Sequence, residues 1–447
     1  MILLMTTAPP EDSPWIFGRK LPPLGLAYVA AALEKADFQV EIIDNYMLKK
    51  PTDYIKSEVR RLAPQIVGIT CGSVTYQRCI ETAKAVKEVL PSCTVVVGGW
   101  HPSYLPESML QHPEIDYVVM GEGERAIVEL ANSITKGDDD SVISKIPGVA
   151  CRYNGKVAKN ATVLISDLDQ IPFPARHLLP MDLYLRKMEF LDANPVDTMN
   201  IIRGCPYNCA FCDTKGLWGS KCRAFGPSRV VEEIDHLVNK YGSQGIYFIG
   251  DNFTINKKRT IEFCRLLKSE LDIEWICDTR ADLVSRDLLK EMRAAGCRTI
   301  WFGVESGSPH ILKKLNKGVS LEQTVNAFKL CREEGIQISC SLMLGIPGET
   351  VSDMKATFNF AKKLNPDWIH FNIFVAYPGS VLYDEVIKNG LYDRFEDFVA
   401  YVKTDDFDYN MLLKLQRKFL RDFHRSPKSI LRKIRRDGFL AVLRRNL

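Results

Sequence analysis

The sequence predicts an α/β protein in which a Rossmann-like parallel sheet is followed by a partial (β/α)6 barrel of the TIM type and a C-terminal helical region. Three observations support this fold class. Short runs of β-branched residues alternate with stretches whose apolar residues recur at helical spacing, a pattern typical of parallel strands joined by helices. The alternation occurs in two blocks separated by a turn-rich stretch. A chain of 447 residues is also long enough for two or three domains.

The first block spans residues 1–140, and we expect it to form the Rossmann-like domain. Its predicted strands are residues 2–6, 40–44, 66–70, 94–97 and 117–120, and two of its helices are predicted over 24–36 and 79–89. A parallel sheet of this kind binds its ligand at the carboxyl ends of its strands. Small and polar residues occur there, which lets a large ligand approach the backbone. The candidate ligand contacts are Thr70, Ser73, Thr75, Gly98, Gly99, His101, Gly121 and Glu122. Ordinary tight turns between strand and helix are the alternative.

Residues 141–190 are rich in turn residues and are expected to form a linker. The strand–helix rhythm then resumes over 191–390, with strands predicted at 199–203, 245–250, 274–279, 299–305, 337–344 and 368–374. Six such units make most of a TIM-type barrel, open rather than closed into eight. Residues 391–447 are expected to be mainly helical.

Three cysteines carry the clearest chemical signal. Cys205, Cys209 and Cys212 follow the first predicted barrel strand, at the end of a barrel where active sites are built. Three thiolates so close together can ligate three irons of one [4Fe–4S] cluster. The fourth iron is then open to chelate the amino and carboxylate groups of S-adenosylmethionine (SAM). The alternative is a structural zinc site, which normally needs a fourth ligand, such as the nearby Cys222, and paired CxxC spacing.

On this run the sequence resembles the radical SAM superfamily, whose signature is CxxxCxxC with an aromatic residue before the last cysteine. Phe211 occupies that position, and the resemblance implies that it lies near the SAM adenine. Gly250 and Asp251 match a strand-end motif that contacts the SAM amino group, although this motif more often carries Glu at the second position. The three cysteines would act as both the metal ligands and the catalytic centre.

Further motifs along the barrel extend the resemblance. Glu305 and Ser306 match a motif that contacts the SAM ribose, and Gly345 and Pro347 match a turn near the adenine. Arg280 could pair with the SAM carboxylate, because a guanidinium suits that group. A structural ion pair is the alternative for this arginine.

The first block in turn resembles the cobalamin-binding radical SAM family, in the LPPLGLA sequence over residues 21–27 and the GGWHP sequence over 98–102. The resemblance covers about residues 1–390 and implies cobalamin as a third cofactor, held by the strand-end residues given above. The Asp-x-His-x-x-Gly motif, which supplies a histidine to cobalt in some cobalamin proteins, is absent. We therefore expect no protein histidine below the cobalt. His101 is the candidate nearby, but a locally hydrogen-bonded histidine is the commoner situation.

The resemblance implies a methyltransferase that acts on an unactivated carbon through a 5′-deoxyadenosyl radical and methylcobalamin. An oxidative cyclase or a carbon–carbon coupling enzyme acting on a tetrapyrrole or a lipid is the first alternative. A non-catalytic corrinoid- or metal-binding regulator is the second. An enzyme of this kind takes a small-molecule or lipid-like substrate and needs an electron donor such as ferredoxin or flavodoxin. The loop 9–23, with Trp15 and Phe17, is expected to shape the shared cavity.

Composition and charge indicate the compartment in which the protein works and argue against one class of partner. With 46% apolar and 26% charged residues, 13 cysteines and no membrane-length apolar run, the chain is expected to be cytoplasmic with reduced thiols. From residue 414 onward, 12 Lys/Arg stand against 2 acids, so the rest of the chain has a net charge of −6, with 47 Lys/Arg against 53 Asp/Glu. That balance argues against a body that binds nucleic acid.

The basic tail reads as an amphipathic helix that starts at Ser426 and Pro427. Its predicted apolar face is Ile430, Leu431 and Ile434, and its basic face is Lys428, Arg432, Lys433, Arg435 and Arg436. Such a helix suits peripheral association with the anionic inner face of a membrane. The alternative is a helix packed on the barrel with its arginines in solvent.

Overall fold

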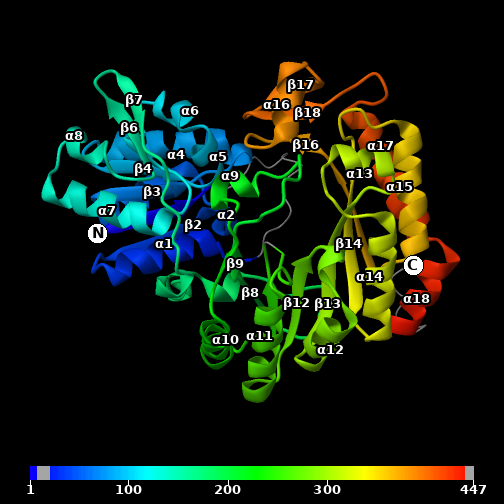
Figure 1. Cartoon of the computed structure of the whole chain (residues 1–447). Coiled ribbons are helices and arrows are strands. Elements are labelled where there is room, and N and C mark those ends of the chain that lie inside the picture. The colour runs from blue at the N-terminus through cyan, green and yellow to red at the C-terminus, as the bar shows by residue number, and fades with distance from the viewer. Residues whose placement is uncertain (8–20, 251, 438–447) are drawn as a thin grey trace.

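The computed structural model describes residues 1–7, 21–250 and 252–437. Two α/β units lie side by side, each built on its own sheet, and a small antiparallel sheet lies above the region between them (Figure 1). The predicted fold class is confirmed. Within the described residues, no helix combines the length and the apolar character needed to cross a membrane.

The N-terminal sheet has seven strands in the order β2-β1-β3-β4-β5-β6-β7, and the first five are parallel. The strands are β1 (Ile2–Thr6), β2 (Val40–Asp44), β3 (Ile66–Thr70), β4 (Thr94–Gly98), β5 (Tyr117–Val119), β6 (Val149–Tyr153) and β7 (Lys156–Lys159). The helices are α1 (Leu24–Lys35), α2 (Asn45–Leu48), α3 (Thr52–Leu62), η1 (Ser73–Thr75), α4 (Tyr76–Val89), α5 (Trp100–Tyr104), α6 (Pro106–Leu110), α7 (Gly123–Lys136) and α8 (Asp140–Ile143). The five predicted strands are all present, with ends that differ by one residue at most.

The hairpin β6–β7 lies in the stretch predicted as a linker, so that prediction was wrong for residues 149–159. The two strands pair antiparallel around Asn154 and Gly155, which have φ of 50° and 71°. An Asn-Gly pair between alternating strands is the strongest short-range hairpin signal, because both central residues of the favoured turn need positive φ. The rest of the stretch is irregular apart from η2 (Leu168–Gln170), η3 (Arg176–Leu178) and η4 (Met181–Leu183).

The barrel sheet has six strands in the order β15-β14-β13-β12-β11-β8, all parallel and open. Its strands are β8 (Val196–Met199), β11 (Gly245–Phe248), β12 (Glu274–Thr279), β13 (Cys297–Glu305), β14 (Gln337–Leu344) and β15 (Trp368–Ile373). The helices are α9 (Thr214–Trp218), α10 (Pro227–Tyr241), α11 (Lys257–Glu270), η5 (Ala281–Leu283), α12 (Arg286–Ala294), α13 (Pro309–Lys314), α14 (Leu321–Glu333) and α15 (Val351–Leu364). The apolar faces of the helices α10 to α15 and the outward side chains of the strands share one core.

The first barrel strand differs from its prediction at 199–203. The strand β8 ends at Met199, and the chain then forms β9 (Ile202–Arg203), which pairs antiparallel with β10 (Arg223–Ala224). Residues 204–222, called the cluster loop below, therefore leave and return through a two-stranded stem. Arg203 and Arg223 are register partners in that stem.

Within the described residues, the C-terminal region from 391 is mainly helical, as predicted, with α17 (Tyr409–His424) and α18 (Pro427–Asp437), but it begins with an unpredicted hairpin of β17 (Tyr392–Glu396) and β18 (Val399–Val402). This hairpin pairs with β16 (Val375–Ala376) in a three-stranded antiparallel sheet, and α16 (Val381–Lys388) lies between β16 and β17 in the chain. Asp397 and Phe398 turn the β17–β18 hairpin with φ of 48° and 64°. Aspartate is enriched at positive φ, but a bulky residue such as Phe398 is an outlier there and does not signal such a turn. The helix α17 packs on the barrel, with Phe419 stacked on Phe358 at 4.5 Å between ring centroids.

Candidate functional site

The cluster loop presents its three cysteines at the carboxyl end of the barrel strands. Cys205, Cys209 and Cys212 are half-buried, as is Cys222, whereas the nine other cysteines are buried. Local backbone bonds fold the loop: the Cys212 N–H donates to the Cys209 carbonyl at 3.1 Å. A longer-range bond joins the Ala210 N–H to the Leu315 carbonyl at 2.9 Å and ties the loop to the barrel.

Hydrogen-bond donors and cations surround these thiols. Asn252 Nδ2 lies 3.5 Å from Cys205 Sγ, and Arg280 Nη1 lies 4.0 Å from Cys209 Sγ. Burial raises the pKa of the Cys209 thiol, while Lys317 and Arg280 oppose that shift. Donors and positive charges of this kind stabilise the anionic sulfurs of an iron–sulfur cluster. The donor set therefore fits three thiolate ligands of a [4Fe–4S] cluster.

A single-ion site is a different arrangement. Among residues 1–7, 21–250 and 252–437, no three His, Cys, Asp or Glu side chains are grouped closely enough to hold one metal ion. A cubane cluster spaces its thiolate ligands more widely than one ion does, because each thiolate binds a different iron.

Of the predicted SAM contacts in and after the cluster loop and β13, two lie together around a lysine and one is used for packing. Phe211 and Glu305 come together around Lys317, whose Nζ lies 2.9 Å from Glu305 Oε1 and 5.8 Å from the centroid of the Phe211 ring. Glu305 ends β13 with φ of 64°, a conformation that is uncommon for a non-glycine residue. Ser306 is instead fully buried, and its hydroxyl lies 3.0 Å from Thr357 Oγ1, so this side chain serves the packing of α15.

Gly250 follows β11 with φ of 118°, and a Cβ there would lie 2.5 Å from Asn200 Nδ2. Asp251 lies outside the described residues. The carboxylate of Asp278 accepts a backbone hydrogen bond from Gly250, and Tyr247 donates its hydroxyl to the two Asp278 oxygens at 3.1 and 3.0 Å. Burial raises the pKa of Asp278 to about 7. The sequence prediction gave Asp278 no role, because it took only the arginine of the DTR sequence at 278–280 as a functional residue.

The turn after β14 is held from within. The backbone N–H groups of Gly345 and Ile346 donate to Glu349 Oε2 at 2.7 and 3.1 Å. Glu349 is fully buried, and burial raises its pKa to about 7. Pro347 is buried in the same turn. The motif residues thus fix the turn through a buried carboxyl group that the sequence prediction did not include.

Arg280 forms the structural ion pair that was its alternative role. Its Nε and Nη2 donate to Asp282 Oδ1 and Oδ2 at 2.9 and 3.0 Å, and its guanidinium lies 3.6 Å from the centroid of the Tyr207 ring. Nη1 is the group that faces Cys209. The arginine is therefore fixed in orientation while one nitrogen points to the cluster loop.

At the carboxyl edge of the N-terminal sheet, His101 is a core residue with 1% exposure. Its Nδ1 lies 3.1 Å from Ser73 Oγ and its Nε2 lies 2.8 Å from Ser108 Oγ. Burial lowers the pKa of His101 to about 4. Phe398, from the β17–β18 turn, packs on the imidazole at 4.9 Å between ring centroids. Both ring nitrogens are thus engaged within the protein.

The other candidate cobalamin contacts on this edge are turn residues. Gly99, with φ of 110°, could not carry a Cβ, which would lie 2.8 Å from the Cys71 carbonyl. It follows Gly98 directly at the end of β4, and the half-buried Thr70 ends the neighbouring strand β3. Thr75 Oγ1 accepts the Gly72 N–H at 3.0 Å. Gly121, with φ of 68°, donates its N–H to Ser103 Oγ at 2.9 Å. These residues form one edge, as predicted, and their local bonds also match ordinary tight turns.

Glu122 takes part in a buried ion-pair network rather than facing an open site. Its Oε1 lies 2.6 Å from Arg223 Nη2, and its Oε2 accepts the Ile165 N–H at 2.7 Å. The adjacent Glu124 pairs with Arg203 at 2.5 Å. These two arginines lie in the two strands of the stem of the cluster loop. The loop after β5 is therefore joined to that stem by ion pairs.

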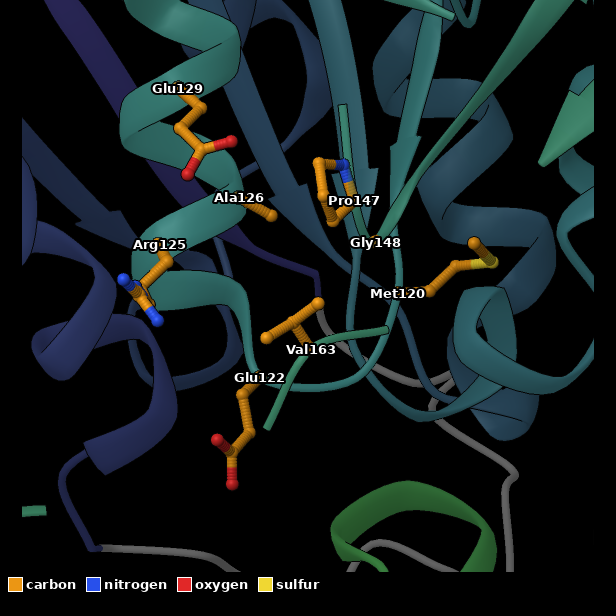
Figure 2. Close-up of a pocket in the computed structure, with 8 residues that line it drawn as sticks. All are labelled: Met120, Glu122, Arg125, Ala126, Glu129, Pro147, Gly148 and Val163. Carbon is orange, nitrogen blue, oxygen red and sulfur yellow. The ribbon is translucent and has the colours of Figure 1, made fainter. Parts of the chain in front are cut away.

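A cavity of about 160 Å³ lies beside α7, and Figure 2 shows the Glu122 carboxylate pointing away from the other residues that line it. The cavity lining also includes Arg125, Glu129 and Val163. It contains none of the cysteines or predicted SAM contacts. Glu122 therefore borders this cavity, while its carboxylate points away from it and pairs with Arg223 in the domain contact.

Comparison with known proteins gives a family match for each of the two α/β units. Residues 199–361 match the Radical SAM superfamily model, and residues 17–131 match the B12 binding domain model. An uncharacterised methyltransferase of Pyrococcus horikoshii is 34% identical over 98% of this chain and 96% of its own length. An anaerobic magnesium-protoporphyrin IX monomethyl ester cyclase of Rubrivivax gelatinosus is 30% identical over 88% of this chain and 72% of its own length.

Among solved structures, the radical SAM methyltransferase TsrM of Kitasatospora setae, with cobalamin and a [4Fe–4S] cluster bound, shares the fold. It aligns with a TM-score of 0.71 over 87% of this chain and 74% of its own, at 19% identity. The full-length likeness to the Pyrococcus protein and the two matched domain models agree with the cysteine loop and the strand-end edge described above. The chain belongs to the cobalamin-binding radical SAM family, whose members are enzymes that use a [4Fe–4S] cluster, SAM and cobalamin.

Proposed function

We propose that this protein transfers a methyl group to an unactivated carbon of a small-molecule or lipid-like substrate. The observation that carries the proposal is the contact between the two cofactor edges: Glu122, beside the cobalamin edge, is paired with Arg223 in the stem of the cluster loop. When bound, the cluster and SAM supply a 5′-deoxyadenosyl radical, and cobalamin carries the methyl group. The contact would hold both chemistries at one mouth of the barrel.

The residues of the barrel edge would bind and orient. Cys205, Cys209 and Cys212 would hold three irons, and Asn252 and Arg280 would direct donors at the sulfurs of Cys205 and Cys209. Phe211, Gly250, Glu305, Gly345 and Pro347 would line the SAM site, with Asp251 beside them in sequence. Lys317 neutralises Glu305, which leaves that carboxylate in place to accept hydrogen bonds from ribose hydroxyls.

The residues of the N-terminal edge would cradle cobalamin mainly through backbone. Thr70, Ser73, Gly98, Gly99 and Gly121 supply small surfaces at adjacent strand ends. His101 would not reach cobalt, because both of its ring nitrogens have hydroxyl partners inside the domain. The lower face of the corrin would then have no protein imidazole, in accord with the missing Asp-x-His-x-x-Gly motif.

Product mass tests the reaction. We would incubate anaerobically reconstituted protein with reductant, methyl-labelled SAM and a panel of lipids and tetrapyrroles. Methyl transfer adds one labelled carbon to a product, whereas oxidative cyclisation, which the identity with the Rubrivivax cyclase keeps as the second candidate, removes hydrogens and adds no label. A labelled product that Cys209→Ala fails to form supports the proposal. An unlabelled product with fewer hydrogens would replace it with the cyclase.

We also propose that the protein works in the cytoplasm, takes its electron from a ferredoxin or a flavodoxin, and touches the inner membrane face through α18. Arg432 packs inward, with its Nη1 3.1 Å from the Asn365 carbonyl, while Ile430 and Leu431 are 38% and 56% exposed. The helix therefore turns apolar side chains outward beside the exposed Lys428. This arrangement suits an anionic bilayer surface.

Sedimentation with vesicles tests the membrane contact. Wild-type protein should sediment with vesicles containing phosphatidylserine and much less with pure phosphatidylcholine, and added salt should weaken the binding. The double variant Ile430→Ser, Leu431→Ser should lose it, while Val381→Ser, at an even more exposed apolar residue of α16, should not. Equal sedimentation of both variants would contradict the role of α18.

A further inference from the structure

The helix α5 connects the cobalamin edge with the cluster loop within five residues. It starts directly after Gly99, at the end of β4. Ser103, within it, donates its hydroxyl to the Gly99 carbonyl at 2.7 Å and accepts the Gly121 N–H at 2.9 Å. The glycine turns after β4 and β5 are thus tied to each other through α5. A ligand that orders these turns would therefore also order the helix.

Tyr104, the last residue of α5, reaches across to the cluster loop. Its hydroxyl donates to the carbonyl of Asp213, the residue that follows Cys212. Its ring packs so closely on Gly216 that a Cβ there would lie 2.6 Å from the ring, and it packs equally closely on Gly379 after β16. One side chain of the N-terminal unit therefore contacts the cluster loop and the C-terminal sheet together.

The stem and the tip of the cluster loop are held in different ways. The stem is fixed by the ion pairs of Arg203 and Arg223 with Glu124 and Glu122, two residues that follow Gly121 after β5. The segment from Asp213 to Gly216 instead contacts α5 through Tyr104. Order in the glycine turns can thus reach the neighbourhood of Cys212 through this tyrosine.

We propose that Tyr104 is a positioning residue that couples cobalamin binding to the order of the cluster loop. Because binding equilibria are linked, the coupling is reciprocal: a loop ordered by its cluster raises the affinity for cobalamin, and bound cobalamin steadies the loop beside Cys212. The inference rests on the proposed cofactor sites but adds a role that neither motif assigns. Tyr104 touches no reacting atom, so its effect should appear in binding linkage.

Titration with hydroxocobalamin tests the coupling without any turnover. The dissociation constant would be measured for cluster-free and anaerobically reconstituted protein. For the wild type we expect the cluster to tighten binding by at least about fivefold, the lower end of typical coupling between sites. In Tyr104→Phe, which keeps the ring but loses the hydroxyl, that ratio should fall towards one. Iron content should match the wild type, because the three cysteines are intact.

Tyr117→Phe is the matched control. Tyr117 lies in β5 of the same unit, and its hydroxyl donates to Asp140 Oδ1 at 2.8 Å, away from the cluster loop. It should keep the wild-type ratio. A second measurement, amide hydrogen exchange over residues 205–219, should show protection by hydroxocobalamin in the wild type that Tyr104→Phe loses.

Two failures would be distinguishable. Wild-type protein that takes up no cobalamin contradicts the proposed function, and this inference with it. Normal cobalamin uptake and iron content, with the same ratio in wild type and Tyr104→Phe, overturns the inference alone.

Discussion

The polar side chains at the carboxyl edges of the two parallel sheets differ in their exposure and in their partners. At the barrel edge, the cysteines of the cluster loop stay half-buried, with donors from Asn252 and Arg280 directed at their sulfurs. At the N-terminal edge, His101 and Glu122 are buried and satisfied by the protein itself. A metal cluster needs side-chain ligands left available, whereas a large corrin can be held by backbone and small residues. The difference explains why a cysteine motif identifies its site more sharply than strand-end residues do.

Removing one cysteine should give the largest effect. Cys209→Ala should lower the iron content from about four per chain to near zero, because the cluster would lose one of the three thiolate ligands proposed for it. Iron and sulfide analysis after anaerobic reconstitution measures this. Cys222→Ser is the control, since Cys222 lies in the same loop and is half-buried. Loss of metal from the Cys222 variant as well, with zinc rather than iron in the wild type, would favour the structural zinc site.

The variant Glu122→Gln tests whether the carboxylate of Glu122 stabilises the fold. Glu122→Gln leaves Arg223 without its carboxylate partner, and breaking a buried pair of this kind costs about 3–5 kcal/mol. The midpoint of urea unfolding should fall accordingly. Glu107→Gln, which breaks an exposed pair with Lys159 at 2.6 Å, should cost less than about 1 kcal/mol. A stable Glu122→Gln variant that fails to bind cobalamin would instead make Glu122 a cobalamin contact.

His101 predicts a dependence of stability on pH. Its pKa falls to about 4 in the folded protein because the imidazole is buried, so the unfolded chain binds a proton more readily below its ordinary pKa. The free energy of unfolding should therefore fall by about 3 kcal/mol as the pH drops from about 6.5 to 4. Above about pH 6.5 the imidazole is neutral in both states, so His101 should make no contribution to the pH dependence there. Urea unfolding of wild type and His101→Asn, compared at pH 7.5 and 5, measures the difference.

The same variant tests the cobalt. The electron paramagnetic resonance spectrum of bound cob(II)alamin should show no nitrogen splitting from a protein imidazole, and His101→Asn should leave it unchanged. Nitrogen splitting that disappears in His101→Asn, while His177→Asn at an exposed histidine retains it, would show that His101 is a cobalt ligand.

The smallest effect concerns the tuning of the cluster. Asn252→Ala removes the amide that lies 3.5 Å from Cys205 Sγ, and loss of a donor to sulfur should make the cluster harder to reduce. A redox titration followed by electron paramagnetic resonance should show a more negative potential at unchanged iron content. Asn389→Ala, at an exposed asparagine that donates to the Glu385 carbonyl at 2.9 Å, should leave the potential unchanged.

The fold was largely predictable because apolar periodicity is a local property. The strands β1, β2, β3, β12 and β14 begin and end where expected. The hairpin β6–β7 was also visible, since Asn154-Gly155 marks its turn, but the turn-rich surroundings hid it. The hairpin β17–β18 was not visible. Its turn needs positive φ at Asp397 and Phe398, a conformation that is held by long-range packing of Phe398 on His101 and Tyr76.

The site was predictable only where a motif names a side chain. The cysteine loop lies where the motif predicted it, because three ligands within eight residues define their own neighbourhood. The roles of Glu122 and Ser306 depend on partners far away in the sequence, Arg223 and Thr357. Arg280 pairs locally with Asp282, but its contact with the sulfur of Cys209 is also long-range. No local pattern reports such pairs. The supporting carboxyl groups Asp278 and Glu349 likewise become evident only through their burial and the backbone amides that they accept.

The most direct test of the central claim is the amount of 5′-deoxyadenosine formed from SAM by anaerobically reconstituted protein. We expect 5′-deoxyadenosine to form only with reductant present, Cys222→Ser to retain its formation and Cys209→Ala to abolish it. Formation by Cys209→Ala at the wild-type level, or none from wild-type protein carrying its full iron, would contradict the assignment of the cluster loop as the reactive centre.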